Sequence, residues 1–194
     1  RTHTRALMAA RLASLARGHS GVGPAVVDLL LGCLTAGVTP VVPERGTVGA
    51  SGDLTPLAHV ALVLIGEGRA EVGGRVLPGA EALAAAGLAP VALGHKEGLA
   101  LVNGTSAMTG IAAVNAERAR RLAECVARLA VLHAEVLGGH AEAWDARFGL
   151  ARPHPGQRAA HARLLALADG SARLTRPVHP PPPLDAAADA TGLF

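Results

Sequence analysis

Apolar residues recur every three or four positions along most of the chain, which is the spacing of amphipathic helices. In the first such segment, residues 4–17, the side chains of Leu7, Met8, Leu12 and Leu15 share one face. The same pattern predicts further helices over 24–36, from 54 to about 65, and over 80–86, 96–110, 111–137 and 157–168. The segment 111–137 is the longest, and it combines an apolar stripe with a charged one.

Glycine and proline divide these helical segments. They recur through residues 38–52, so we expect a loop without regular structure there. Two short runs flank Gly73-Gly74, a dipeptide suited to tight turns, and predict a small β-hairpin near 70–77. A new helix is expected directly after Asp53, whose side chain can cap the first turn, with Pro56 early in the helix.

The last part of the chain has a different character. Residues 176–184 contain a proline run, which is typical of polyproline II or disordered segments. We therefore expect a proline-rich, disordered tail over 171–194. The chain begins at Arg1 in the middle of a helical pattern, which favours a fragment of a longer protein.

Composition supports a mainly α-helical fold. Of 194 residues, 50% are hydrophobic and 17% are charged, which excludes disorder over the whole length. Only 2% are aromatic, so the core is built from alanine, leucine and valine. Such residues pack closely spaced helices well and include few of the side chains that fill sheets.

Charge and cysteine usage narrow the possible partners. The net charge is +3, but the arginines are scattered and aromatics are scarce, which argues against nucleic-acid binding. Cys33 and Cys125 stand far apart inside apolar runs, so we expect buried thiols in a reducing compartment, the cytoplasm. No apolar run reaches the roughly 20 residues of a membrane span, so no membrane association is expected.

Metal binding is not expected either. The chain has nine histidines but no H-E-x-x-H. Two H-x-E matches, at His133 and His140, lack the P-C-x-x-C that a zinc deaminase requires.

The most informative stretch runs from Gly46 to His59, Gly-Thr-Val-Gly-Ala-Ser-Gly-Asp-Leu-Thr-Pro-Leu-Ala-His. It is a glycine-spaced loop that leads into the start of an apolar helix. Backbone N–H groups and the positive end of the helix dipole would favour an anion or a developing negative charge there. A flexible entry loop with Asp53 as a helix cap explains the same residues.

This stretch resembles the core of the aromatic amino acid ammonia-lyase family, which includes histidine, phenylalanine and tyrosine ammonia-lyases and 2,3-aminomutases. The resemblance implies the histidine ammonia-lyase-like (fumarase/aspartase-like) helical fold. It also implies that Ala50, Ser51 and Gly52 are catalytic, since in the family an Ala-Ser-Gly tripeptide cyclises to the electrophile 4-methylideneimidazol-5-one. No metal or other cofactor is implied.

The residue types suit this chemistry. Ring closure requires the nitrogen of Gly52 to attack the carbonyl carbon of Ala50, and the missing Cβ at position 52 permits the approach. Loss of water from Ser51 then leaves an exocyclic methylene. Asp53 could hold the loop geometry.

A second block, Lys96 to Ser106, resembles the family segment K-E-G-L-A-L-x-N-G-T. By that resemblance Asn103 is catalytic: it lies beside the electrophile and hydrogen-bonds near it or to the amino acid substrate. Two weaker matches, over 15–21 and 151–157, are expected to be structural. The resemblance covers roughly residues 4–170.

The resemblance implies non-oxidative deamination of an aromatic amino acid by a homotetramer. L-Histidine, giving urocanate and ammonia, is the expected substrate because histidine enzymes are the commonest bacterial members. Ser106 is more reminiscent of tyrosine or phenylalanine enzymes and aminomutases, which stay as alternatives. The family's catalytic base is a Tyr, and this chain contains none. A truncated, inactive helical fragment is therefore a further alternative.

Overall fold

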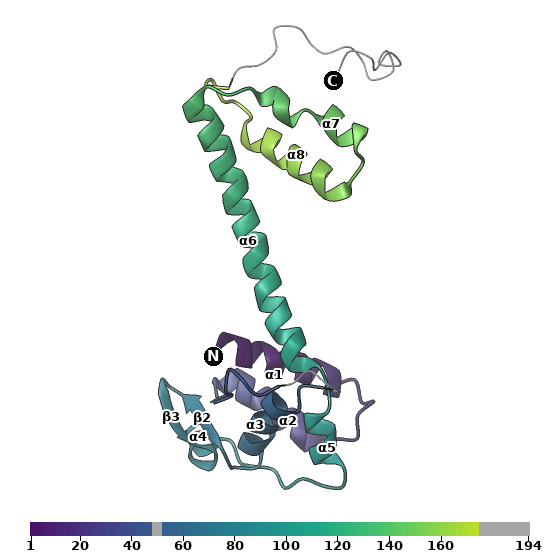
Figure 1. Ribbon diagram of the computed structural model, residues 1–194. Coiled ribbons are helices and arrows are strands. Elements are labelled where there is room, and N and C mark those ends of the chain that lie inside the picture. The colour runs from purple at the N-terminus through teal and green to yellow at the C-terminus, as the bar shows by residue number, and fades with distance from the viewer. Residues whose placement is uncertain (48–51, 175–194) are drawn as a thin grey trace. The chain divides into compact units, whose positions relative to one another are not determined.

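The computed structural model describes residues 1–47 and 52–174 (Figure 1). The chain divides into two compact units, Arg1–Arg118 and Ala119–Phe194, which are considered separately below as the first and second unit. Their boundary falls within the long helix α6, Ser106–Leu137.

The described part of the first unit is mainly helical, as predicted. Besides the start of α6, it contains α1 (Thr2–Leu15), α2 (Pro24–Ala36), α3 (Leu54–Leu64), α4 (Gly79–Ala85) and α5 (Glu97–Val102). The expected helical segment 96–110 is wrong in one respect. Residues Asn103 to Thr105 separate α5 from α6, because the backbone becomes extended at Asn103, the C-cap of α5.

Sequence signals account for the ends of α2. Pro24 occupies the first turn, where its missing N–H costs no intrahelical bond. The helix ends at Gly37, whose φ of 78° is left-handed and whose N–H bonds to Cys33 O. Only glycine adopts this conformation without a steric penalty.

A three-stranded antiparallel sheet lies in the first unit, in the order β1 (Thr39–Pro40), β2 (Arg69–Val72) and β3 (Arg75–Pro78). The pairing of β2 with β3 confirms the predicted hairpin. The prediction of no regular structure over 38–52 is wrong at β1, where Thr39 pairs with Glu71 and Pro40 with Ala70. Proline is tolerated in this short edge strand because edge positions need no ladder donor.

The core of the first unit is formed mainly by residues of its helices, joined by Ala70 of β2. Helix α3 contacts α2, α4 and α5, and α4 packs on β2 and β3. The fully buried side chains include Met8, Leu30, Leu64 and Leu83. This apolar packing holds α3, at whose N-terminus Asp53 lies.

Helices α1 and α6 approach each other closely at Gly110. A Cβ built on this residue would lie 2.5 Å from the Leu7 backbone nitrogen and 2.7 Å from the Ala6 carbonyl carbon. Real Cβ atoms do not come that close to backbone, so the contact depends on glycine.

The second unit contains the remainder of α6, a short 3₁₀ helix (Ala141–Trp144), α7 (Ala146–Ala151) and α8 (Pro155–Leu167). Its buried apolar cluster is small, formed by Val131, Ala168 and Leu174. Cys125 lies here and is exposed, so the prediction of two buried thiols is wrong for it. The apolar stripe of α6 that carries the cysteine is itself open to solvent. Cys33, in the first unit, is buried, and burial raises the pKa of its thiol to about 11.

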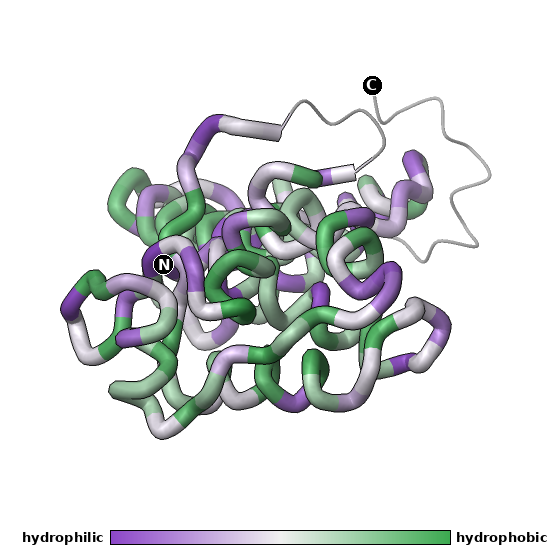
Figure 2. Tube along the Cα trace, turned by 90° about the horizontal axis from the view of Figure 1, so that it is seen from below, coloured by the Kyte–Doolittle hydropathy of each residue, from purple (hydrophilic) through white to green (hydrophobic). Residues whose placement is uncertain are grey.

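Hydrophilic and hydrophobic residues interleave along the helices (Figure 2). Among residues 1–47 and 52–174, no helix is both long and apolar enough to cross a membrane. Of the predicted tail, residues 175–194 lie outside the described residues. The division at residue 170 therefore stays a prediction.

Candidate active site

The glycine-rich loop of the sequence analysis ends at the start of α3. Of the predicted catalytic residues, Ala50 and Ser51 lie outside the described residues, whereas Gly52 and Asn103 lie inside them. The structure therefore shows how the loop is held at its two ends, Thr47 and Gly52.

Gly52 packs directly against the backbone of Gly104. A Cβ built at position 52 would lie 3.0 Å from Gly104 O and 3.1 Å from Gly104 N. Neither is a mobile side-chain atom, so a larger residue would force the two segments apart. Because Gly104 directly follows Asn103, the structure brings two of the predicted catalytic positions together from loops distant in sequence.

Asp53 fixes this junction with its backbone and its carboxylate. Its N–H donates to Gly104 O at 2.8 Å. Its Oδ2 accepts from the Met108 N–H at 2.8 Å, and its Oδ1 accepts from Thr47 Oγ1 at 3.3 Å. The side chain is 4% exposed, so these bonds are shielded from water.

The expected capping role of Asp53 is therefore wrong in one respect. The residue occupies the N-cap position of α3, but its side chain makes no capping bond to that helix. It binds an N–H in the first turn of α6 instead, where a carboxylate satisfies a donor that has no partner within the helix. One carboxylate thus joins the start of α6 to Thr47 on the far side of the loop.

The side chain of Asn103 is exposed. Its Nδ2 donates to Leu99 O at 3.1 Å, which holds the amide over the last turn of α5. In the described part of the chain, no hydrogen bond to its Oδ1 is found. An amide oriented in this way can offer its oxygen to a ligand without changing charge.

Arg11 was missed by the sequence reasoning. It is 4% exposed, and its Nη2 donates to Ala100 O and, at 2.6 Å, to Asn103 O. Burial lowers the pKa of this guanidinium from its ordinary value. A signal existed, because position 11 follows Leu7 by four residues and precedes Leu15 by four, which places an arginine on the apolar face of α1.

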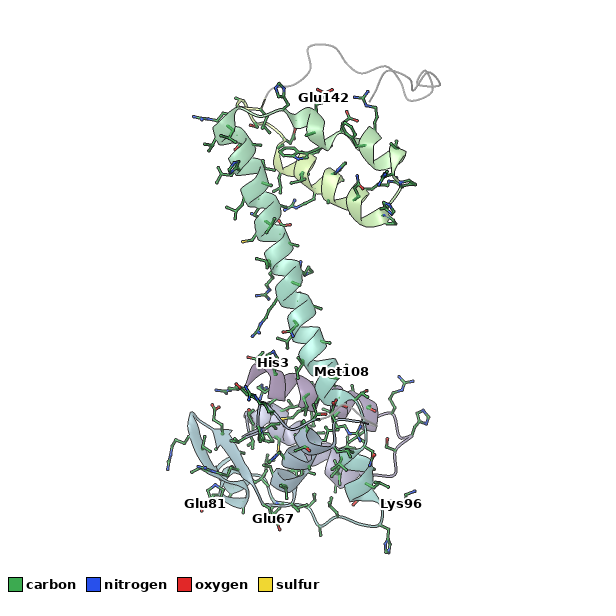
Figure 3. All side chains as sticks on the ribbon, in the orientation of Figure 1. His3, Glu67, Glu81, Lys96, Met108 and Glu142 are labelled. Atoms are coloured by element: carbon green, nitrogen blue, oxygen red, sulfur yellow. The ribbon has the colours of Figure 1, made fainter. Side chains whose placement is uncertain are left out.

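Glu97, also in the second motif block, anchors the segment that precedes α5. Its carboxylate accepts from the Gly23 N–H at 2.5 Å and from the Gly94 N–H at 2.6 Å. These bonds, the one from Gly23 first, lower the pKa of Glu97. Lys96, which begins the same block, adopts a left-handed conformation with φ of 63° and lies at the turn before α5 (Figure 3).

A pocket of about 820 Å³ adjoins Asp53 in the first unit. His3 and Met108, which Figure 3 labels at the starts of α1 and α6, line it together with Thr47 and Asn115. Its wall combines apolar surface with a few polar groups, as small-molecule sites do.

Comparison with known proteins identifies the family to which the chain belongs. The sequence model for "Aromatic amino acid lyase" matches residues 1–190. The chain belongs to the aromatic amino acid lyase family. The histidine ammonia-lyase of Gloeobacter violaceus is 54% identical over 168 residues, which are 87% of this chain and 33% of that protein. The tyrosine ammonia-lyase of Cereibacter sphaeroides is 52% identical over 178 residues, which are 91% of this chain and 34% of that protein.

Solved structures of the family confirm the expected fold. Phenylalanine aminomutase of Pantoea agglomerans has a TM-score of 0.84 at 34% identity and is matched over 90% of this chain and 33% of its own. Histidine ammonia-lyase of Trypanosoma cruzi has a TM-score of 0.79 at 35% identity, over 84% and 32%. The chain spans about a third of the length of the curated lyases that it matches.

The described residues are compatible with the electrophile expected of a lyase in this family. Ring closure needs the backbone nitrogen of residue 52, and a Cβ there would lie 3.0 Å from Gly104 O, closer than Cβ atoms normally come. Within residues 1–47 and 52–174, no cluster of three histidine, cysteine, aspartate or glutamate side chains could hold an ion.

Proposed function

We propose that the protein containing this chain catalyses the non-oxidative deamination of an aromatic amino acid. Ala50, Ser51 and Gly52 are the residues that cyclise, and Asn103 is the residue that meets the substrate. When formed, the 4-methylideneimidazol-5-one group supplies an electrophile for the amino group of the substrate. L-Histidine is the proposed substrate, with urocanate and ammonia as products.

One observation carries this proposal, namely the contact of Gly52 with Gly104. Closure requires the nitrogen of Gly52 to form a bond to the carbonyl carbon of Ala50, and the carbonyl oxygen leaves as water. The hydroxyl of Ser51 leaves as a second water. A backbone that is held on one side by Gly104 and by the buried Asp53 loses little further conformational freedom on closure.

Asn103 supports the second half of the proposal. Its exposed amide lies one residue from Gly104, and its oxygen accepts no hydrogen bond from the described residues. It can therefore accept a hydrogen bond from the amino group of an amino acid. The small-molecule substrate and the homotetramer implied by the resemblance stay predictions, as does the cytoplasmic location inferred from cysteine usage.

Peptide mass tests the electrophile directly. Proteolysis of the folded protein should yield a peptide spanning residues 46–59 that is lighter than its sequence mass by two water molecules. Ser51→Ala removes the hydroxyl that must leave, so its peptide should not show this loss. An unmodified wild-type peptide from folded protein would contradict the proposal.

Tyrosine is a second candidate substrate, and two observations favour it. The tyrosine ammonia-lyase relative is almost as similar as the histidine enzyme, and the buried Ser106 follows the Asn-Gly-Thr segment. Incubation of the purified protein with histidine, tyrosine or phenylalanine distinguishes the candidate substrates, because the products urocanate, coumarate and cinnamate differ in ultraviolet absorbance. An isomeric β-amino acid as the only product would identify an aminomutase. No product, despite the loss of two waters, would favour the inactive fragment.

A further inference from the structure

Arg11 is a buried cation with no carboxylate partner in the described part of the chain. It lies on the apolar face of α1 and is 4% exposed, and its Nε is buried without a hydrogen bond. Removing a guanidinium from water is costly unless strong acceptors replace the water. The arrangement of those acceptors indicates what Arg11 holds in place.

The acceptors are the carbonyl oxygens of Ala100 and Asn103, at the end of α5. Carbonyls at a helix C-terminus lack intrahelical donors and carry partial negative charge, so a guanidinium suits them. Its Nη1 lies against Gly104, so closely that a Cβ on Gly104 would overlap it. Arg11 therefore lies along the backbone of residues 100–104 and binds it at more than one point.

The same backbone also contacts Gly52 and Asp53, the described residues at the end of the electrophile-forming loop. Gly104 O accepts the Asp53 N–H at 2.8 Å, and a Cβ on Gly52 would lie only 3.0 Å from the same oxygen. The segment 103–104 thus contacts both the Arg11 guanidinium and the Gly52-Asp53 backbone. A shift of this segment by a fraction of an ångström would move the nitrogen that must attack Ala50.

We propose that Arg11 is a positioning residue for the cyclisation of Ala50-Ser51-Gly52, which acts by holding the Asn103-Gly104 backbone against Gly52 and Asp53. This inference rests on the proposed function. Arg11 does not touch the reacting atoms. It fixes the backbone that contacts Gly52, and through the Asn103 carbonyl it fixes the residue that carries the proposed substrate-binding amide.

Cyclisation kinetics in the full chain test the proposal. The protein is made in a cell-free reaction and sampled over time, and the fraction of the 46–59 peptide that has lost two waters is measured. Arg11→Met removes both hydrogen bonds but keeps an apolar chain of similar length. We expect cyclisation to be roughly 10- to 100-fold slower, since small misplacements of reacting groups have effects of that size.

Two further variants separate positioning from general stability. Arg5→Met is the matched control, because Arg5 lies in the same helix and donates to Leu34 O at 2.9 Å, away from the loop. It should cyclise at the wild-type rate. Arg11→Lys retains the cation but lacks the planar fork, so it should recover part of the rate. Melting temperature and far-ultraviolet circular dichroism report folding for every variant.

The outcomes distinguish this proposal from the proposed function. If wild-type protein never loses two waters, the proposed function fails before Arg11 is tested. If wild type cyclises and a folded Arg11→Met variant cyclises equally fast, the role of Arg11 is overturned. Should Arg11→Met not fold, Arg11→Lys decides: a slower rate at unchanged melting temperature supports positioning, and the wild-type rate overturns it.

Discussion

The two units of this chain use burial differently. In the first unit, helices and sheet enclose an extensive apolar core together with the buried polar side chains of Arg11 and Asp53. In the described part of the second unit, the buried apolar cluster is small, and large apolar side chains along α6 remain exposed, such as Leu122 at 66% and Val136 at 69%. Charged side chains there pair near the surface.

This difference shows that a sequence signal for a helix is separate from a signal for what covers its apolar face. The apolar residues of α6 have the same helical spacing as those of α1. Leu7, Met8 and Leu15 of α1 are buried, however, whereas most large apolar side chains in the described part of α6 are exposed. Periodicity therefore identifies a helix in both units but not what covers it. The proposed site lies in the unit where polar groups are held by buried backbone, which favours precise geometry.

The largest expected effect comes from truncating the core of the first unit. Leu30→Ala removes a side chain that is fully buried, and it should lower the free energy of unfolding by about 3 kcal/mol through lost burial and the cavity left behind. Leu129→Ala in α6 makes the same chemical change at a side chain that is 61% exposed. Its effect should stay within about 0.5 kcal/mol.

Urea unfolding followed by circular dichroism measures both variants against wild type. A Leu129→Ala loss as large as that of Leu30→Ala would show that the α6 stripe is covered in solution. The difference in burial between the two units would then describe a single copy of the chain and not the protein in solution.

Much of the fold could be predicted from the chain because local signals and burial agree. Pro24 and Gly37 mark the ends of α2, and Gly73-Gly74 marks the hairpin. Strand β1 could not be predicted, since its two residues are defined by pairing with β2, a contact between distant segments. The exposure of Cys125 was missed for a related reason, because an apolar run does not state which of its faces is covered.

In the candidate site too, local features could be predicted and contacts between distant segments could not. Gly52 and Asn103 could be singled out from motifs, but the contact between their segments arises only from folding. Asp53 could be placed at the start of α3, whereas its bond to the Met108 N–H depends on α6, which begins far along the chain. Arg11 carried a signal of its own, because its spacing from Leu7 and Leu15 places it on the apolar face of α1.

Two glycine-to-alanine variants, one in each unit, test the difference in packing, and their expected effect on stability is intermediate. Gly110→Ala places a methyl group against the α1 backbone, and we expect it to lower the free energy of unfolding by about 1–3 kcal/mol, as overpacking does. Gly156→Ala in α8 of the second unit is the control, because a Cβ there meets no atom within 4 Å. Alanine favours helix over glycine, so this variant should be neutral or slightly stabilised. Thermal unfolding of both variants tests the contrast, and an undisturbed Gly110→Ala protein would contradict the close contact.

The smallest expected effect concerns the surface charges of the second unit. Glu124 in α6 accepts hydrogen bonds from Arg163 of α8 and, at 3.0 Å, from Arg128 Nε. These arginines, Arg163 first, lower the pKa of Glu124 from 4.5 to about 2.

Because the folded pKa lies below the unfolded one, the pair stabilises the fold above about pH 4.5, and this contribution is lost as the pH falls towards about 2. Glu124→Gln should therefore melt slightly below wild type at neutral pH, and the difference should vanish in acid. The effect is small since the pair is partly exposed and screened by salt. Glu135→Gln in the same helix controls for loss of a carboxylate. A difference that persists unchanged down to pH 2 would show that the Glu124–Arg163 pair does not stabilise the second unit.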